Sequence, residues 1–194
     1  MTQFTVHTPD TAPEASRLAL ESVKKGFGGM LPNLYGVMAE SPALAEAYLE
    51  LGKIFNKTSL TDEERHVVWL AVNYENECTY CMAAHSVVAT MGGVPDSEVA
   101  ALRTGAPLSN PKLEAMRHFT AHMVQARGWA DPAEVEALLA AGYTNQTVLD
   151  VILGIGQKTL SNYANHIADT PIDRPFQTAE WTAAMKADGD NAAA

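Results

Sequence analysis

The chain has 194 residues, of which 47% are hydrophobic, enough for one sizeable core but too few for two independent domains. Its net charge of −10 at pH 7 disfavours nucleic acid and anionic membranes as partners, because both would repel it. No apolar run approaches the length of a membrane span, and the first residues lack the pattern of a signal peptide, so we expect a cytoplasmic protein.

The chain predicts helices throughout and no convincing strand, so we expect an all-α fold. Residues 1–13 are polar, hold two prolines and lack helical periodicity, which predicts an extended arm that could wrap a neighbour. A moderate apolar stripe predicts a helix over residues 13–25, ended by nearby glycines. Residues 30–34 are expected to form a buried apolar connector.

Two stretches carry clear helix-start signals. Ser41 before Pro42 is typical of a cap followed by proline at the first helical position, and this helix should end near Asn56. Thr61 and Glu64 form a capping-box pattern, in which each side chain bonds the other residue's backbone amide. A second helix therefore begins here.

That second helix should break near Asn76, which we expect to cap the next helix just before Cys78. Cys78 and Cys81 would then lie in the first helical turns. Backbone amides there carry partial positive charge, so at least one cysteine should have a lowered pKa. Gly92 and Gly93 should end this helix with a left-handed cap.

Further helices follow to the end of the chain, and we expect one domain over residues 1–185. The predicted spans are 96–102, 111–127, 132–141, 145–166 and a weak terminal helix over 176–185. The helix over 145–166 is predicted from apolar residues at helical spacing, namely Val148, Ile152, Ile155, Leu160 and Tyr163. Residues 186–194 are polar and alanine-rich, which predicts a mobile tail. A faint echo between residues 81–85 and 162–166 suggests two related helical hairpins.

The chemistry is concentrated in Cys78, Cys81 and His85. Spacings of three, four and seven place these three side chains along one face of a helix. Two thiols beside a base suit a reversible dithiol and disulfide couple, since the thiolate is the nucleophile and the second sulfur resolves the product. Tyr80 and Met82 could line the substrate's route to them.

These residues resemble a known family, the AhpD-like alkylhydroperoxidases of the carboxymuconolactone decarboxylase superfamily. The likeness is strongest over residues 60–95, where a capped helix leads into Cys-x-Tyr-Cys, a histidine four residues on and a Gly-Gly turn. The stretches 41–44, 162–166 and 170–173 look like the peroxidase-related branch of that family. Together they cover most of the chain.

The resemblance implies an AhpD-like helical fold, a stable homo-oligomer (dimer, trimer or hexamer) and reduction of a small hydroperoxide. By position, Cys81 matches the cysteine that attacks the peroxide and Cys78 the one that relays a proton and resolves the product. His85 matches the relay histidine. An external dithiol protein would then reduce the disulfide, because the chain has no second redox pair.

His66 stands where the family's relay has a glutamate. Glu64 cannot replace it, because two residues on a helix turn the direction by about 200°. His66 could pass a proton but cannot supply a fixed negative charge behind His85. Glu77 would oppose thiolate formation, since a neighbouring carboxylate raises a thiol's pKa. These departures favour weak peroxidase activity.

Other interpretations of the same residues stay open. Cys78, Cys81 and His85, with His66 or a carboxylate as a fourth ligand, could bind zinc, although structural zinc sites usually draw on two separated ligand pairs and the chain has one. The thiols could also be inert core groups. We expect neither a metal nor a cofactor. Asn162, Asn165 and His166 are expected to cap helices or join subunits.

The leading hypothesis is a thiol-dependent hydroperoxide reductase with Cys81, Cys78, His85 and His66 as its catalytic residues. One alternative is a lactone decarboxylase like the carboxymuconolactone enzymes, whose chemistry does not need the thiols. Another is a non-catalytic redox sensor whose disulfide changes its assembly.

Overall fold

The computed structural model describes residues 4–186, and these form an all-α fold without strands. The helices, with their bounds, are α1 Glu14–Gly26, α2 Asn33–Met38, α3 Pro42–Phe55, α4 Asp62–Glu75, α5 Thr79–Met91, α6 Asp96–Thr104, α7 Pro111–Gln125, α8 Pro132–Ala140 and α9 Asn145–Ala168. A 3₁₀ helix, η1, covers Arg174–Ala179. The all-α prediction is confirmed.

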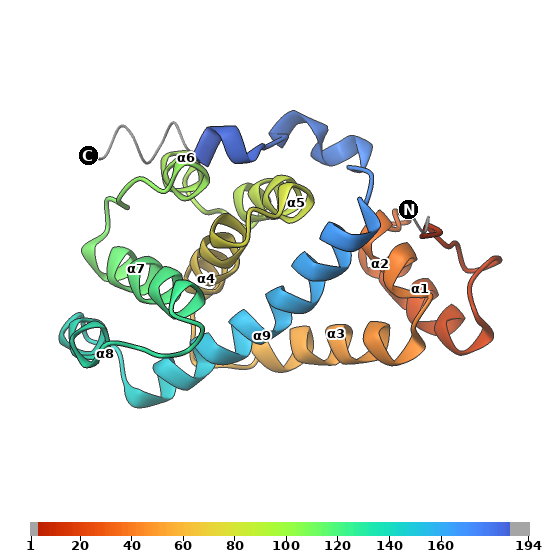
Figure 1. The fold of residues 1–194 in the computed structure, drawn as a ribbon. Helices are drawn as coiled ribbons and strands as arrows, with labels where there is room; N and C mark the ends of the chain where they lie inside the picture. Colours follow the sequence, from red (N-terminus) through yellow and green to blue (C-terminus); the bar gives the residue numbers. More distant parts are fainter. Residues whose placement is uncertain (1–3, 187–194) are drawn as a thin grey trace.

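Helices α4 and α5 lie at the centre of the molecule (Figure 1). Helix α4 packs against α5, α7 and α9, and the long helix α9 crosses from α7 and α8 to the first helices of the chain. Buried apolar side chains of α4 to α7 form the main core. A smaller apolar cluster holds both cysteines together with residues of α2 and α3. The thiols therefore belong to this smaller cluster and not to the main core.

The predicted caps of α3 and α4 are present. Ser41 accepts a hydrogen bond from the backbone amide of Leu44 at the start of α3. Thr61 and Glu64 form the complete capping box at the start of α4. Gly93 has a φ of 88°, so the left-handed turn after α5 is also confirmed.

Two local predictions are wrong. Residues 30–34 are not simply a connector, because Asn33 begins the short helix α2. Asn76 does not cap α5; its side-chain amide donates to Asn162 Oδ1 at 2.9 Å, and Cys78 itself takes the N-cap position without a side-chain hydrogen bond. In both cases long-range contacts outweigh the local pattern.

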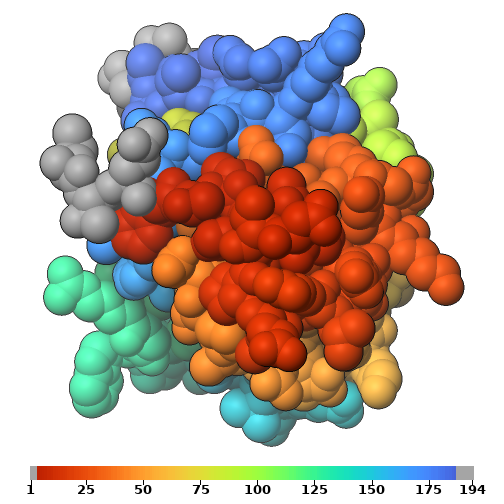
Figure 2. All heavy atoms as spheres, turned by 90° about the vertical axis from the view of Figure 1, so that its right-hand side faces the viewer, coloured from red at the N-terminus to blue at the C-terminus, as the bar shows by residue number. Residues whose placement is uncertain are grey.

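The N-terminal arm packs on its own chain. The backbone amide of His7 donates to the Gly36 carbonyl at 3.2 Å, and His7 Nε2 lies 2.6 Å from Glu40 Oε2. Figure 2 shows this segment lying over the first helices. Since Gly36 has no Cβ, the arm can approach α2 closely; a Cβ there would lie 2.7 Å from the His7 carbonyl.

At the C-terminal end, η1 replaces the first part of the predicted helix over 176–185. Lys186, predicted to begin the mobile tail, is instead held near Glu75 and Glu77 at 3.5 and 3.7 Å. The remainder of that tail, residues 187–194, lies outside the described part of the chain. Within residues 4–186 no single helix meets the length and hydropathy of a membrane span; only α8 and α9 together do, across a bend of 114°.

Candidate active site

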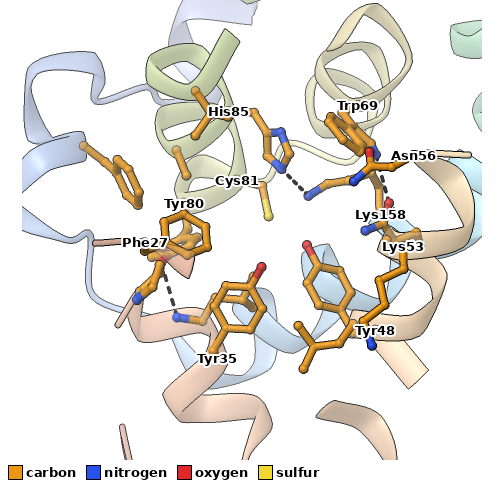
Figure 3. Close-up of a pocket in the computed structure, with 18 residues that line it drawn as sticks. Phe27, Tyr35, Tyr48, Lys53, Asn56, Trp69, Tyr80, Cys81, His85 and Lys158 are labelled. Carbon is orange, nitrogen blue, oxygen red and sulfur yellow. Dashed lines mark hydrogen bonds between the residues drawn. The ribbon is translucent and has the colours of Figure 1, made fainter. Parts of the chain in front are cut away.

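A cavity of about 340 Å³ opens beside Cys81. Figure 3 shows the Sγ of Cys81 pointing into a space bordered by Tyr35, Tyr48 and Tyr80, with Trp69 nearby. The remaining lining is mostly apolar and comes from α2, α3, α5 and α9, together with Phe27 and Phe176. A small substrate with an apolar or aromatic part therefore fits against this sulfur.

Cys81 is buried and surrounded by polar groups of α9. Asn165 Nδ2 donates to Cys81 Sγ at 3.1 Å and lies 4.0 Å from Cys78 Sγ. Ser161 Oγ lies 3.7 Å from Cys81 Sγ. Both thiols are free, so the structure represents the reduced protein.

The two thiols differ in acidity. Burial opposes ionisation of Cys81, but a hydrogen bond from Cys78, the charge of Lys158 and hydrogen bonds from Ser161 and Asn162 outweigh it and lower its pKa. The hydrogen bond to Cys81, with burial, raises the pKa of Cys78. Cys81 is therefore the more acidic thiol of the pair, and Cys78 is the less acidic one.

Lys158 brings a positive charge to the site from α9. Its side chain is fully buried, and its Nζ lies 2.8 Å from His85 Nε2 (Figure 3). Burial, the charge of Lys158 and His66 together hold the pKa of His85 well below its usual value. His85 is therefore neutral and accepts a hydrogen bond from the ammonium group.

A chain of asparagines holds α5 and α9 in register at the site. Asn73 Nδ2 donates to the Cys81 carbonyl at 3.2 Å, and its Oδ1 accepts from Asn162 Nδ2 at 2.9 Å. Asn76 donates to the same Asn162 side chain. Asn73 and Asn162 are fully buried, and each amide here has a partner. The first turn of α5 is thereby fixed against α9.

Tyr80 fixes the opposite wall of the cavity. Its hydroxyl donates to Asp173 Oδ2 at 2.6 Å and accepts from the Leu34 amide at 3.2 Å. Asp173 also accepts from the amide of Asn33 at the start of α2. Tyr80 lines the cavity as predicted, whereas Met82 is fully buried and does not line it.

The structure brings Cys81 and His85 together at the cavity, with Cys78 beside Cys81 but outside the cavity lining. His66 is buried and also lies outside that lining. Its ring contacts Trp69 edge-on with centroids 5.4 Å apart, and Trp69 in turn lies 5.2 Å from the His85 ring. Across the described residues no hydrogen bond joins His66 to His85; both rings have a buried Nδ1 without a partner.

Three polar residues were not predicted from the sequence to be part of the site: Lys158, Ser161 and Asn165. Asn162 and Asn165 were expected to cap helices or join subunits; instead, Asn165 donates to Cys81 Sγ, and a hydrogen bond from Asn162 helps to lower the pKa of Cys81. The available signal was their spacing, because Lys158, Ser161, Asn162 and Asn165 share one helical face. Glu77 was expected to raise the pKa of a neighbouring thiol. Its side chain is exposed, and its Oε1 lies 3.7 Å from Lys186 Nζ, which offsets its charge.

Metal binding has little support in the geometry. Within residues 4–186 no three His, Cys, Asp or Glu side chains are grouped to hold a metal ion. The Nε2 atom of His85 faces the Lys158 ammonium group, and that positive charge would repel a metal cation at this nitrogen. The donor set therefore fits acid–base chemistry at sulfur better than zinc.

Comparison with known families gives one match. The sequence model of the Carboxymuconolactone decarboxylase family matches residues 42–132, which include Cys78, Cys81 and His85. No curated protein matches the chain.

Solved structures share the fold across nearly the whole chain. An AhpD-core, peroxidase-related protein of Ralstonia eutropha JMP134 has a TM-score of 0.80 and 21% identity, covering 90% of this chain and 93% of its own. A peroxidase-related protein of Silicibacter sp. TM1040 has a TM-score of 0.74 and 20% identity, covering 91% and 97%. The debrominase Bmp8, in complex with 2,3,4-tribromopyrrole, has a TM-score of 0.77 and 19% identity, covering 92% and 96%.

Proposed function

We propose that this chain is a dithiol peroxidase for small organic hydroperoxides. The family match and the shared fold support its assignment to the AhpD and carboxymuconolactone decarboxylase superfamily. One observation carries the proposal. The Cys81 sulfur, with its lowered pKa, points into an apolar cavity beside the Lys158 and His85 pair. A nucleophile, a proton source and room for an organic group therefore meet at one place.

In the first step the Cys81 thiolate attacks the distal oxygen of the hydroperoxide. The S–O bond forms as the O–O bond breaks, and the electron pair leaves on the alkoxide. The Lys158 and His85 pair supplies the proton that converts the alkoxide to an alcohol. Cys81 becomes a sulfenic acid, so the peroxide has gained the two electrons that the sulfur has lost.

In the second step the Cys78 sulfur attacks the Cys81 sulfenic sulfur. The S–S bond forms, the S–O bond breaks, and the Cys78 proton leaves with the hydroxide as water. Cys78 can wait as a neutral thiol because its pKa is raised, and it lies next to Cys81 through their shared hydrogen bond. The product is a disulfide between Cys78 and Cys81.

His66 retains a place in the proposal as a more distant member of the proton relay. Its buried Nδ1 has no partner, and its charge state affects His85, whose pKa it helps to lower. Gly92 leaves room for this ring, since a Cβ there would lie 3.1 Å from His66 Nε2. Its effect on the rate should be smaller than that of His85, because Trp69 lies between the rings.

Single-turnover kinetics test the proposal. Reduced protein is mixed with cumene hydroperoxide, and tryptophan fluorescence is followed while quenched samples are analysed for the disulfide by mass spectrometry. We expect one disulfide per chain and one equivalent of alcohol. Cys81→Ser should abolish both, and Cys78→Ser should yield alcohol without the disulfide. Wild-type protein that forms no disulfide while the peroxide persists would overturn the proposal.

The aromatic lining of the cavity favours a second candidate, reductive dehalogenation of a small aromatic halide. Tyr35, Tyr48 and Trp69 offer flat surfaces to an aromatic ring. The same dithiol could supply two electrons, with halide leaving, a proton replacing it on the ring and the disulfide forming. Release of bromide from a brominated pyrrole, absent in Cys81→Ser, would favour this candidate over peroxide reduction.

The other hypotheses predict different results in the same experiments. A lactone decarboxylase would keep its activity in a Cys78→Ser, Cys81→Ser double variant. A redox sensor would form the disulfide and change its assembly, but it would not consume peroxide repeatedly when a dithiol is supplied.

A further inference from the structure

The two thiols face different openings in the protein surface. Cys81 lines the apolar cavity, and Cys78 does not. Cys78 instead lines a separate cleft of about 470 Å³, formed between the start of α5 and the end of α9. Cys81 is absent from the lining of that cleft, and Tyr80 alone borders both openings.

The cleft contains buried polar atoms that no protein group satisfies. Asn165 Oδ1 and Thr170 Oγ1 are buried without a hydrogen-bond partner, in side chains that are 5% and 7% exposed. Both residues line the cleft. Buried polar atoms without partners are uncommon in folded proteins, and a bound ligand is one of the things that satisfies them. Asn165 and Thr170 therefore place two such atoms in the cleft that Cys78 also lines.

The rim of the cleft is acidic. Glu77 and Asp169 are exposed there, together with His166. Glu77 has a φ of 54° and Asp169 a φ of 48°, so two left-handed turns bring these residues to the rim. Lys186, 3.7 Å from Glu77, offsets part of the charge. An anionic thiol should therefore bind less well than a neutral one.

We propose that this polar cleft is the docking site for the reductant, a slender uncharged dithiol that attacks Cys78 while the substrate uses the other opening. The inference rests on the disulfide of the proposed function. Cys78 lies at 0% exposure behind the rim, so a flat protein surface could not reach its sulfur without a projecting thiol. A small dithiol, or one carried on a narrow arm, fits the cleft.

The electron flow favours attack at Cys78. The reductant's thiolate bonds to Cys78 Sγ, the Cys78–Cys81 bond breaks, and the electron pair leaves on Cys81. Asn165 and the positive charge of Lys158 stabilise that leaving thiolate. The thiol with the lower pKa is the better leaving group, so attack on Cys78 is faster than attack on Cys81.

A dithiol then completes the reaction. Its second thiolate attacks the reductant sulfur in the mixed disulfide, and Cys78 departs and takes up a proton. The reductant leaves as a disulfide, having given two electrons. A monothiol lacks this step, and the adjacent Cys81 thiolate can displace it and restore the protein disulfide.

The site of attack is tested with protein oxidised by diamide, so that its reduction can be measured even if peroxide is not the substrate. The oxidised protein is treated with cysteamine, quenched with iodoacetamide and analysed by fragment mass spectrometry. We expect cysteamine on Cys78 and the alkyl group on Cys81. The reverse assignment would overturn the proposal.

The place of entry is tested with two matched substitutions at exposed rim positions. Thr79→Tyr at the polar cleft should slow reduction by dithiothreitol roughly tenfold and leave disulfide formation by the substrate unchanged. Lys53→Tyr at the apolar cavity should leave reduction unchanged. Equal reduction rates in wild type and Thr79→Tyr would contradict entry through the cleft.

Charge at the rim gives an independent readout. A Glu77→Gln, Asp169→Asn double variant should raise the rate with glutathione, relative to dithiothreitol, by about fivefold, because two negative charges near an anionic thiol are removed. The difference should shrink at high salt. An unchanged ratio of the two rates would count against docking at this rim.

Discussion

The Sγ of Cys81 depends on side chains from another helix for its chemistry. Asn165 donates to it, and Lys158 places a buried positive charge nearby. An ammonium group at 0% exposure is costly unless it is compensated, and here its partners are a neutral histidine and the thiolate. We therefore infer that the charge of Lys158 stabilises the Cys81 thiolate.

Replacing Lys158 should make Cys81 less acidic. In Lys158→Met the positive charge is lost, the pKa of Cys81 rises, and alkylation by iodoacetamide near neutral pH should slow roughly tenfold. The thiolate's ultraviolet absorbance, followed against pH, measures the pKa directly. Lys53→Met is the control, because Lys53 lines the same cavity but is exposed. If Cys81 has the same pKa in Lys158→Met as in the wild type, the proposed role of Lys158 is wrong.

The histidines should make the fold sensitive to acid. The folded-state pKa of both His85 and His66 is lowered, mainly by burial. Below the ordinary pKa of about 6.5 the unfolded chain therefore binds protons that the folded chain does not, so stability is complete above that pH and declines below it. His85→Gln should flatten the decline, because one such group is gone. Urea unfolding from about pH 7 to pH 5 measures this, and an unchanged slope would contradict it.

At the scale of single elements, α9 supplies most of the polar side chains around the thiols. The sequence pattern favoured Val148, Ile152, Ile155, Leu160 and Tyr163 as its inward residues. The structure instead buries a face that includes Gly154, Lys158, Ser161 and Asn165, while Ile152 and Tyr163 are exposed. Val148, Ile155 and Leu160 still pack against the core. Hydrophobic periodicity therefore finds the helix but not the whole of its buried face, because polar residues beside the thiols are also buried.

The starts of α3 and α4 could be predicted because their hydrogen bonds are local. The cap at Ser41 and the box at Thr61 and Glu64 are satisfied by neighbours in sequence, so the local pattern contains all the partners. Asn76, Asp173 and Asn165 act through residues more than eighty positions away. No single-sequence pattern shows such partners, which is why the dithiol and His85 were found while Lys158 and the asparagines were not.

The packing of α9 depends on a missing side chain at Gly154. A Cβ there would lie 2.7 Å from Phe55 and 2.8 Å from Val68, so Gly154→Ala should push α9 away from α3 and α4. We expect a loss of about 1–3 kcal/mol in the free energy of unfolding. Gly26→Ala is the matched control, since a Cβ there meets nothing within 4 Å. Equal losses in the two variants would contradict the packing argument.

At the scale of the whole molecule, α9 leaves an apolar stripe on the outside. Leu149 and Ile152 are exposed on one side of α9, and Tyr163 and Ile167 are exposed on the same side about three turns further on. We expect the predicted homo-oligomer to use this stripe, because exposed apolar patches often mark protein–protein contacts. The same helix would then carry the site on one face and the subunit contact on the other.

The oligomer is tested at Ile152. Ile152→Glu adds a charge to the stripe and should reduce the mass measured by sedimentation equilibrium to that of a smaller assembly, with the helical content unchanged. Glu21→Gln, a charge change on the exposed surface of α1, is a control expected to leave the mass unchanged. The stripe is not a subunit contact if wild type and Ile152→Glu have the same mass.

The central claim for the whole molecule is that the Sγ atom of Cys81 attacks the substrate. Its most direct test is to trap the oxidised sulfur with dimedone when Cys78→Ser protein meets an organic hydroperoxide. We predict a stoichiometric adduct on Cys81, formed about as fast as the alcohol, and none on Cys78 in Cys81→Ser. An adduct on Cys78 in the Cys81→Ser protein, with Cys81 unmodified in the other variant, would contradict the assignment.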